Sequence, residues 1–238
     1  MAMQYEAKFN LRSNDFDCYG KLLPSAIFDM FQEVAGNHAE KLGIGFEELK
    51  AKNLLWVIVR SKFEVVKHPC QHSEVTVKTW PLPANKISFR RDYLMTDEKG
   101  EVLIRGTSDW FIINSQTRSF EKAERVYPSD EFVTDYAISE KPKKLHSYKG
   151  ETDEYSVVPA FCDIDRNGHV NNTKYANFIL NALDLGNKDI ESFQIDYHKE
   201  VLKGEQLIIS TAIEDDTAFA SGKNKDGDTM FICEIKIK

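Results

Sequence analysis

The sequence of 238 residues contains no long apolar run. Its longest uncharged apolar stretch, residues 54–59, is far shorter than the ~20 residues that a membrane-spanning helix needs. The N-terminal residues contain no basic segment followed by an apolar segment, which is the pattern of a secretory signal. We therefore expect neither a membrane span nor a secreted protein.

Paired cysteines and an excess of positive charge are also missing. The four cysteines, Cys18, Cys70, Cys162 and Cys233, show no C-x-x-C spacing, which favours reduced thiols in the cytoplasm over a disulfide framework or a zinc site. With 31 basic and 38 acidic side chains, the net charge of -7 argues against nucleic acid as a partner. An acidic protein partner would need a local basic patch. The candidate residues are Arg90, Arg91, Arg105, Arg118, Lys141, Lys143 and Lys144.

The composition is that of an ordinary globular protein. Hydrophobic residues make up 42% of the chain and charged residues 29%, and disordered chains contain fewer apolar residues than this. A chain of 238 residues lies near the upper limit for one hydrophobic core. Length alone therefore permits one large domain or two small domains that share a core.

An internal repeat divides the chain. Two sets of apolar residues follow the spacing of a helix with one apolar face, and they are separated by a constant offset of 148 positions. The two sets are Ile27, Met30, Phe31, Val34 and Ala35, and Tyr175, Phe178, Ile179, Ala182 and Leu183. The same offset places Asp17 on Asp165 and Gly20 on Gly168, so the predicted helices also share the turn before them.

Strand patterns flank both predicted helices, with one strand before and four after each. The predicted strands are residues 5–11, 56–66, 74–80, 87–95 and 102–113 in the first half, and residues 155–158, 193–197, 206–213, 217–221 and 230–237 in the second half. Turn residues at 96–100 and 224–227 predict a hairpin at the same place in each half. The pattern indicates a duplicated β-α-β-β-β-β unit.

One helix among about five antiparallel strands is buried most economically when the sheet wraps around it, and two such sheets can join edge to edge. The sequence therefore predicts an α+β fold of the double-hotdog type. We expect an N-terminal repeat at residues 1–118, a linker at 119–153 and a C-terminal repeat at 154–238. Because the linker is long for a plain loop, we expect part of it to carry structure.

The candidate site lies in residues 163–172, which read D-I-D-R-N-G-H-V-N-N. Asp165, Asn167 and His169 are spaced by two, so an extended segment would place their side chains on one side of the backbone. The segment leads into a predicted helix, whose N-terminal N–H groups and dipole favour a developing oxyanion. This combination is suited to acyl transfer.

Two other interpretations compete with catalysis. The segment matches the first half of a calcium-binding EF-hand loop, but Lys174 holds the twelfth position, where that loop needs glutamate. Asn171, Asn172 and Thr173 are interpreted mainly as helix caps, and a histidine in a turn need not be catalytic.

The repeat favours a catalytic role for the candidate histidine. In the first half, Tyr19 stands in place of Asn167 and Lys21 in place of His169, so the turn does not require the asparagine or the histidine. We therefore expect chemistry in the second half and a binding role for the first half.

Residues 165–172 resemble the D-x-N-x-H-V-N-N signature of fatty acyl-ACP thioesterases, and Tyr197-His198-Lys199-Glu200 resembles the Y-x-x-E motif of that family. The resemblance implies hydrolysis of fatty acyl-ACP to a free fatty acid and ACP, which terminates fatty acid synthesis, with no metal and no cofactor. It implies that Asp165, Asn167, His169 and Glu200 are catalytic. Glu200 and His169 would activate and position a water, while Asp165 and Asn167 would orient the histidine or hold the thioester carbonyl.

The chain departs from many plant members of that family at one position. They have cysteine directly after the Y-x-x-E glutamate, whereas this chain has Val201, which excludes a cysteine nucleophile there. Cys162 is interpreted as a small structural residue, and we expect Cys162→Ala to retain full thioesterase activity in a thiol-release assay. Because no plastid transit segment is recognised, the resemblance points to a bacterial member.

Several alternatives stay open at this point. An acyl-CoA thioesterase would differ only in the carrier, a hydratase or dehydratase of the same fold would leave the thioester intact, and a non-catalytic acyl-binding module would not need the four polar residues. The acyl chain is expected in the first half, where Met30, Val34 and Trp56 are candidate contacts. Acyl-chain length and oligomeric state, for which a homodimer is one candidate, are not determined by the sequence.

Overall fold

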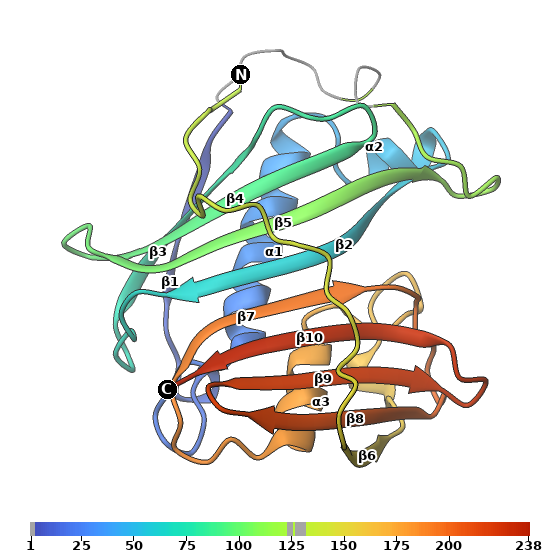
Figure 1. The fold of residues 1–238 in the computed structure, drawn as a ribbon. Helices are drawn as coiled ribbons and strands as arrows, with labels where there is room; N and C mark the ends of the chain where they lie inside the picture. Colours follow the sequence, from blue (N-terminus) through green and yellow to red (C-terminus); the bar gives the residue numbers. More distant parts are fainter. Residues whose placement is uncertain (1–2, 123–125, 127–131) are drawn as a thin grey trace.

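The computed structural model describes residues 3–122, 126 and 132–238. Its strands form one antiparallel sheet in the order β1-β3-β4-β5-β2-β7-β10-β9-β8-β6, which curves around the helices (Figure 1). The first-half elements are β1 (Tyr5–Asn10), α1 (Pro24–Lys41), α2 (Phe46–Ala51), β2 (Leu54–Val65), β3 (Glu74–Pro81), β4 (Ser88–Asp97) and β5 (Val102–Asn114). The second-half elements are β6 (Asp153–Val157), α3 (Lys174–Leu183), β7 (Ile190–Tyr197), β8 (Leu207–Glu214), β9 (Thr217–Asn224) and β10 (Thr229–Ile237).

The strand order of the second half is the mirror image of that of the first, and the two halves join along β2 and β7. Phe63 of β2 lies opposite Phe193 of β7, and both side chains are fully buried with their rings stacked 5.7 Å apart between centroids. Phe28 of α1 packs edge-on against both rings. The predicted double hotdog is therefore present, with one hydrophobic core that spans both halves.

Both repeat helices are longer than the apolar spacing alone defines. Helix α1 begins at Pro24, where proline is tolerated because the first N–H groups of a helix have no intrahelical partner. It ends before Gly43, whose φ of 71° is one that glycine adopts without steric cost. Helix α2 was not predicted, because its six residues, FEELKA, contain too few apolar positions to define a face.

Most strand predictions are confirmed to within a few residues at each end. The largest differences are at β7, which begins three residues before its predicted range, at Ile190, and at β9, which ends three residues after its predicted range, at Asn224. Both predicted hairpins are confirmed, and Gly100 and Gly227 occupy the left-handed position in each, with φ of 83° and 82°. Among the described residues, no helix is long and apolar enough to cross a membrane.

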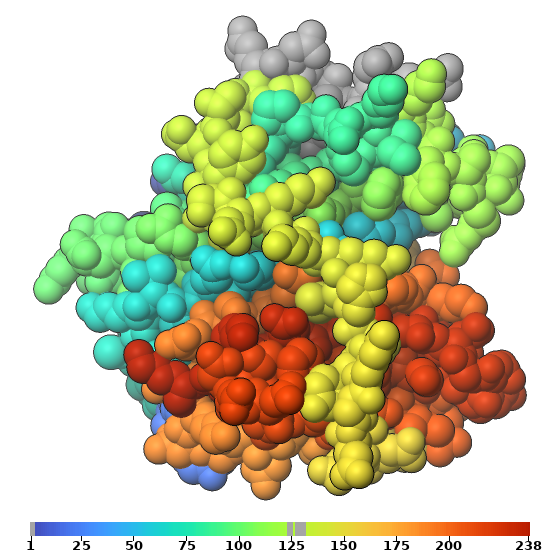
Figure 2. All heavy atoms as spheres, viewed as in Figure 1, coloured from blue at the N-terminus to red at the C-terminus, as the bar shows by residue number. Residues whose placement is uncertain are grey.

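The connection between the halves crosses the outer face of the sheet, where Figure 2 shows it in yellow over the strands of the second half. Arg60 of β2 and Asp196 of β7 form a two-point ion pair with N–O distances of 2.6 and 2.5 Å. This pair also binds the connection, since Arg60 donates to the Pro142 carbonyl and Asp196 accepts the Leu145 N–H. The junction between β2 and β7 therefore anchors the connection. Residues 123–125 and 127–131 of the predicted linker lie outside the described residues.

Two of the arginines in the predicted basic patch are not available on the surface. Arg91 is 6% exposed and bonds to Nδ1 of His38 and the hydroxyl of Thr79. Arg90 pairs with the fully buried Asp92 at 3.1 Å. Burial raises the pKa of Asp92, while Thr107 and Arg90 oppose that shift. This pair stabilises the packing of the connection, because the same carboxylate accepts the N–H of Ala137.

Candidate active site

The two halves contain the same turn before their helices. In the second half the N–H of Asp165 donates to the His169 carbonyl at 2.8 Å, and the N–H of Gly168 donates to the Asp165 carbonyl at 3.1 Å. Asp17, Gly20 and Lys21 make the same two bonds in the first half, at 2.9 and 3.1 Å. The repeat predicted from sequence thus extends to individual backbone hydrogen bonds.

The candidate segment is a closed turn and not an extended strand, which corrects the predicted geometry. Oδ1 of Asp165 accepts the N–H groups of Asn167 and His169, at 2.8 and 3.3 Å, and Oδ2 accepts the side-chain amide of Asn167 at 3.2 Å. Asparagine and aspartate favour such turns because their side chains bond to backbone groups two residues on. Asp165 therefore holds the turn and the Asn167 amide together.

Asp163, the first carboxylate of the calcium-like pattern, also has a structural role. It ends the short 3-10 helix Phe161–Asp163, and its Oδ2 accepts the N–H of Ala160 at 2.8 Å. Asp15 makes the same bond to Arg12 in the first half, at 2.7 Å. Because both halves use this aspartate in the same way, the acidic spacing that resembled a calcium loop is explained by local backbone bonding.

Glu200 reaches the turn from the segment after β7. The N–H of Val170 donates to the Val201 carbonyl at 2.8 Å, and His169 forms an isolated antiparallel bridge with Leu202, so the two segments lie side by side. Nε2 of His169 lies 3.5 Å from Oε2 of Glu200. These side chains are 30% and 38% exposed, which leaves them accessible to a substrate. The two predicted motifs are brought together in one site.

The first half contributes Arg118, which the sequence offered only as part of a basic patch for an acidic partner. Nη2 of Arg118 lies 3.2 Å from the same Oε2 of Glu200. Arg118 ends the hairpin turn after β5, where its φ of 58° lies in the left-handed region that favours glycine. The sequence did not predict the contact of this guanidinium with Glu200, which only the structure reveals.

A second arginine stacks between the two halves beside the site. The guanidinium of Arg166, which is within the turn, lies 3.5 Å from the centroid of the Phe46 ring at the start of α2. Such a contact is attractive because the ring face carries negative charge. Two positive groups, Arg118 and Arg166, therefore lie around the candidate site, although the protein as a whole has a net charge of -7.

The tyrosine of the Y-x-x-E motif supports the start of α3. The Tyr197 hydroxyl donates to the Asn172 carbonyl at 3.1 Å, and burial raises the pKa of this phenol well above its usual value. Thr173 is the cap residue of α3, and its N–H donates to the side chain of Asn171 at 3.1 Å. The predicted capping role thus applies to Asn171, whose Oδ1 accepts both the N–H and the hydroxyl of Thr173, whereas Asn172 and Thr173 line a cavity.

This cavity, which we call the active-side cavity, lies where α1, β2 and β5 meet the start of α3. Its lining includes Phe31 and Gln32 of α1, Ile58 of β2, Trp110 of β5, and Asn172 and Tyr197. Both halves therefore form its wall. One lining residue, Asn172, lies three positions after His169 in the sequence.

The three predicted acyl contacts lie nearby but not in that lining. Met30 and Val34 are buried in the main core, at 7% and 0% exposure. The indole N–H of Trp56 donates to the Ile44 carbonyl at 3.0 Å, and its ring packs against Phe89 in a second core cluster. Their contact with substrate stays a prediction.

Comparison with solved structures agrees with the fold. The crystal structure of an acyl-ACP thioesterase from Bacteroides thetaiotaomicron superimposes with a TM-score of 0.88 over 100% of both chains, at 24% identity. The 12:0-ACP thioesterase from Umbellularia californica superimposes with a TM-score of 0.86 over 100% of this chain and 98% of that one, at 23% identity. At these identities the likeness establishes the double-hotdog fold.

Comparison of sequences establishes the family. A palmitoyl-acyl carrier protein thioesterase from Arabidopsis thaliana is 31% identical over 226 residues, which are 88% of this chain and 55% of that protein. An oleoyl-acyl carrier protein thioesterase from Coriandrum sativum is 27% identical over 91% of this chain and 65% of that protein. The chain thus spans little more than half the length of the first of these curated relatives. The family models of the acyl-ACP thioesterase N-terminal and C-terminal domains match residues 2–135 and 146–236, so this chain belongs to the acyl-ACP thioesterase family.

Proposed function

We propose that this protein hydrolyses the thioester of fatty acyl-ACP and releases a free fatty acid and ACP, a reaction that ends fatty acid synthesis. The observation that carries the proposal is the approach of His169 to Glu200 across two separate motifs, at 3.5 Å. Family membership supports the same substrate class, since the relatives are named as palmitoyl- and oleoyl-acyl carrier protein thioesterases.

The proposed reaction needs only water and the side chains of the site. Glu200 and His169 take a proton from a water as its oxygen bonds to the thioester carbon, which forms a tetrahedral oxyanion. The C–S bond then breaks, and the proton passes to the leaving thiolate, so the products are a carboxylic acid and a thiol. General-base help of this kind contributes ~10²- to 10⁴-fold to the rate.

We assign different tasks to the four residues of the site. Glu200 and His169 act on the water, and the contact between them is expected to shorten when substrate excludes solvent. The Asn167 amide is held by Asp165 and is therefore available to the thioester carbonyl. Asp165 acts by positioning, since its carboxylate accepts the backbone N–H groups of Asn167 and His169.

We propose a division of labour between the halves that follows the repeat. Residues 154–238 supply the catalytic group, residues 1–118 bind the acyl chain, and residues 119–153 connect them. Phe31 and Trp110 of the active-side cavity support this division, because both are apolar first-half residues in the cavity next to the site. Met30, Val34 and Trp56 are proposed to support that wall from the core.

The cytoplasm is the proposed location, and all four cysteines are free thiols, as that compartment favours. The carrier protein is the proposed partner, and Arg118 and Arg166 are proposed to attract its negatively charged groups. A homodimer is the proposed assembly, for which sedimentation of the purified protein is the direct test.

Thiol release from purified protein tests the proposed activity. Acyl-ACP and acyl-CoA of several chain lengths are supplied, and the wild-type protein is compared with His169→Ala and Glu200→Ala. We expect release from acyl-ACP that falls by at least about a hundredfold in either variant. Equal release by all three proteins would contradict the site. Faster release from acyl-CoA would identify CoA as the carrier, and binding without any release would identify an acyl-binding module.

A further inference from the structure

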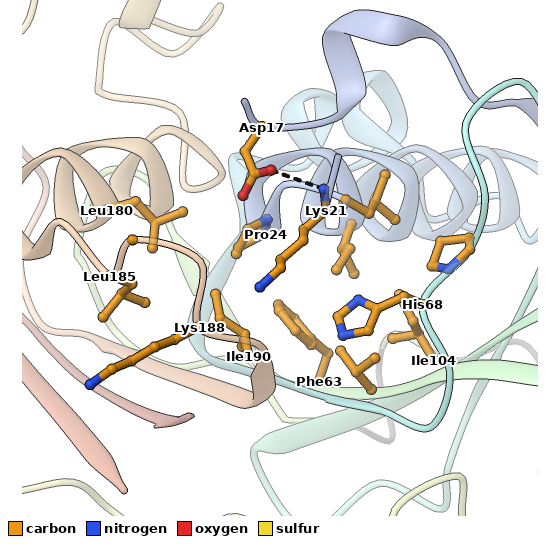
Figure 3. Close-up of a pocket in the computed structure, with 15 residues that line it drawn as sticks. Asp17, Lys21, Pro24, Phe63, His68, Ile104, Leu180, Leu185, Lys188 and Ile190 are labelled. Carbon is orange, nitrogen blue, oxygen red and sulfur yellow. Dashed lines mark hydrogen bonds between the residues drawn. The ribbon is translucent and has the colours of Figure 1, made fainter. Parts of the chain in front are cut away.

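A second cavity lies beside the first-half turn, and we call it the paired cavity. Figure 3 shows its wall, to which Phe63, Ile104, Leu180, Leu185 and Ile190 contribute apolar side chains. The first-half turn and the segment after β2 form one side, and the end of α3 with the loop after it forms the other. It is therefore a cavity between the halves, like the active-side cavity.

The two cavities are copies of each other under the repeat. The offset of 148 places Pro24 on Asn172 and Gln32 on Leu180; Pro24 and Leu180 line the paired cavity, and Asn172 and Gln32 line the active-side cavity. Each cavity thus uses the start of the helix of one half and a later turn of the helix of the other. The paired cavity is the first-half counterpart of the proposed acyl site.

The counterpart of Glu200 can be identified from backbone bonds after β2 and β7. The N–H groups of His198 and Lys199 both donate to the Met230 carbonyl, at 2.8 and 3.3 Å. The N–H groups of Val66 and Lys67 both donate to the Leu103 carbonyl, at 2.8 and 3.0 Å.

The equivalent residue follows by counting along the chain. Glu200 lies two residues after His198, and His68 lies two residues after Val66. His68 therefore stands where the active half has Glu200, and Lys21 stands where it has His169. The histidine–carboxylate pair of the active half is replaced by two basic side chains.

These basic side chains converge on one internal carboxylate. Nζ of Lys21 lies 2.9 Å from Oδ1 of Asp189, and Nε2 of His68 lies 3.5 Å from the same oxygen. Lys188 also lines the cavity. Asp17, whose carboxylate is in the cavity lining, accepts the N–H groups of Tyr19 and Lys21, so it is committed to the turn.

The position of Asp189 shows where a carboxylate can contact Lys21 and His68. Its backbone is held by two hydrogen bonds with Lys238, at 3.1 and 2.9 Å, but its side chain is 46% exposed and can swing into solvent. Lys21 lowers the pKa of Asp189, as expected for a carboxylate that sits on an ammonium group. A ligand carboxylate can take this place on Lys21 and His68 while its tail enters the apolar wall.

We propose that the paired cavity is a second, non-catalytic site that binds a free fatty acid, with its carboxylate on Lys21 and His68 in place of Asp189. Charge complementarity selects the head group, because a desolvated carboxylate needs a positive partner. The apolar wall selects the tail, because each methylene that leaves water for the wall favours binding. The proposal does not depend on thioester hydrolysis, since the ligand is the free acid.

The test is binding of ¹³C-carboxyl dodecanoate to the intact protein, followed by NMR below the concentration at which the acid forms micelles. We expect a bound carboxyl signal that persists in His169→Gln/Glu200→Gln. In Lys21→Gln/His68→Gln we expect the affinity for dodecanoate to fall by about tenfold, because the ammonium group and the imidazole that hold the carboxylate are both lost. Lys52→Gln/His146→Gln removes the same two residue types from exposed positions and serves as the matched control.

Asp189→Asn is expected to strengthen dodecanoate binding, whereas damage to the fold would weaken it. Removing the internal carboxylate while keeping the side-chain shape is expected to tighten dodecanoate binding by about threefold, a modest gain because the pair is partly exposed. The proposal is wrong if no dodecanoate binds, if its only signal responds to the His169 and Glu200 changes, or if Lys21→Gln/His68→Gln binds like the control. Weaker binding by Asp189→Asn, or equal binding of neutral dodecanol, would also overturn it.

Discussion

The turn at residues 17–21 and the turn at residues 165–169 have the same backbone and different side chains. Each closes on an aspartate whose Oδ1 accepts two N–H groups, and each needs glycine at φ of 79° or 85°. The side chains that the backbone does not need differ, with Tyr19 and Lys21 in one turn and Asn167 and His169 in the other. Positions that differ between otherwise equal turns are therefore the best candidates for chemistry.

The two cavities differ in the same sense. The active-side cavity has polar groups in its lining, including Ser61, Thr107 and Thr173. At the paired cavity the corresponding interior is formed by Phe63, Ile104 and other apolar side chains. A polar wall suits a reacting thioester and water, whereas an apolar wall with a basic rim suits an unreactive acid.

The largest expected effect separates the two turns by activity. His169→Ala should lower thiol release from acyl-ACP by about 10²- to 10⁴-fold, because the general base loses its partner. Lys21→Ala, the equivalent change in the first half, should stay within about twofold of wild type, since it touches no proposed catalytic group. Comparable losses in both variants would mean that the turns are not functionally different.

The next expected effect is on the aspartates that the turns share. Asp17→Ala and Asp165→Ala should each lower the free energy of unfolding by about 1 kcal/mol, since each leaves two N–H groups without their acceptor. Only Asp165→Ala should also lower activity, through the position of His169. Urea unfolding and thiol release on the same preparations measure both quantities, and an active Asp165→Ala protein would remove this residue from the proposed site.

A smaller effect concerns the arginine that joins the halves. Arg118→Gly should lower activity by about tenfold, because Glu200 loses a charged partner. It should also stabilise the fold by up to about 1 kcal/mol, because glycine adopts the left-handed backbone without strain. Asp215→Gly, at a φ of 53° in another turn, is the control for the backbone effect alone. Unchanged activity in Arg118→Gly would show that Glu200 acts without it.

The smallest effect concerns pH and the segments after β2 and β7. Burial lowers the pKa of His198 below its ordinary 6.5, with Lys144 and Arg60 adding to the shift and Asp196 opposing it. The unfolded chain therefore binds more protons just below pH 6.5, so stability falls as the pH decreases through this range. His198→Val, which copies Val66 of the first half, should reduce the fall in melting temperature between pH 7 and pH 5. The same fall in both proteins would assign it to other groups.

Much of the fold could be predicted because the features that define each repeat depend on residues close together in the sequence. The apolar spacing of α1 and α3, the turn aspartates and the hairpin glycines all depend on neighbours within a few residues. Helix α2 could not be predicted, because its short segment is held by packing of Leu49 in a core cluster. The extended geometry expected for Asp165, Asn167 and His169 was wrong, because side-chain bonds close the turn.

The sequence by itself determined the duplication, the turn before each helix, and the residue types that carry the proposed chemistry, because these follow from periodicity and local hydrogen bonding. Only the tertiary structure decided which distant segments meet. It placed Arg118 of the first half on Glu200 of the second, and it placed Lys21 and His68 around Asp189. Such contacts depend on how the strands pair and how the two sheets join, and no local pattern encodes that arrangement.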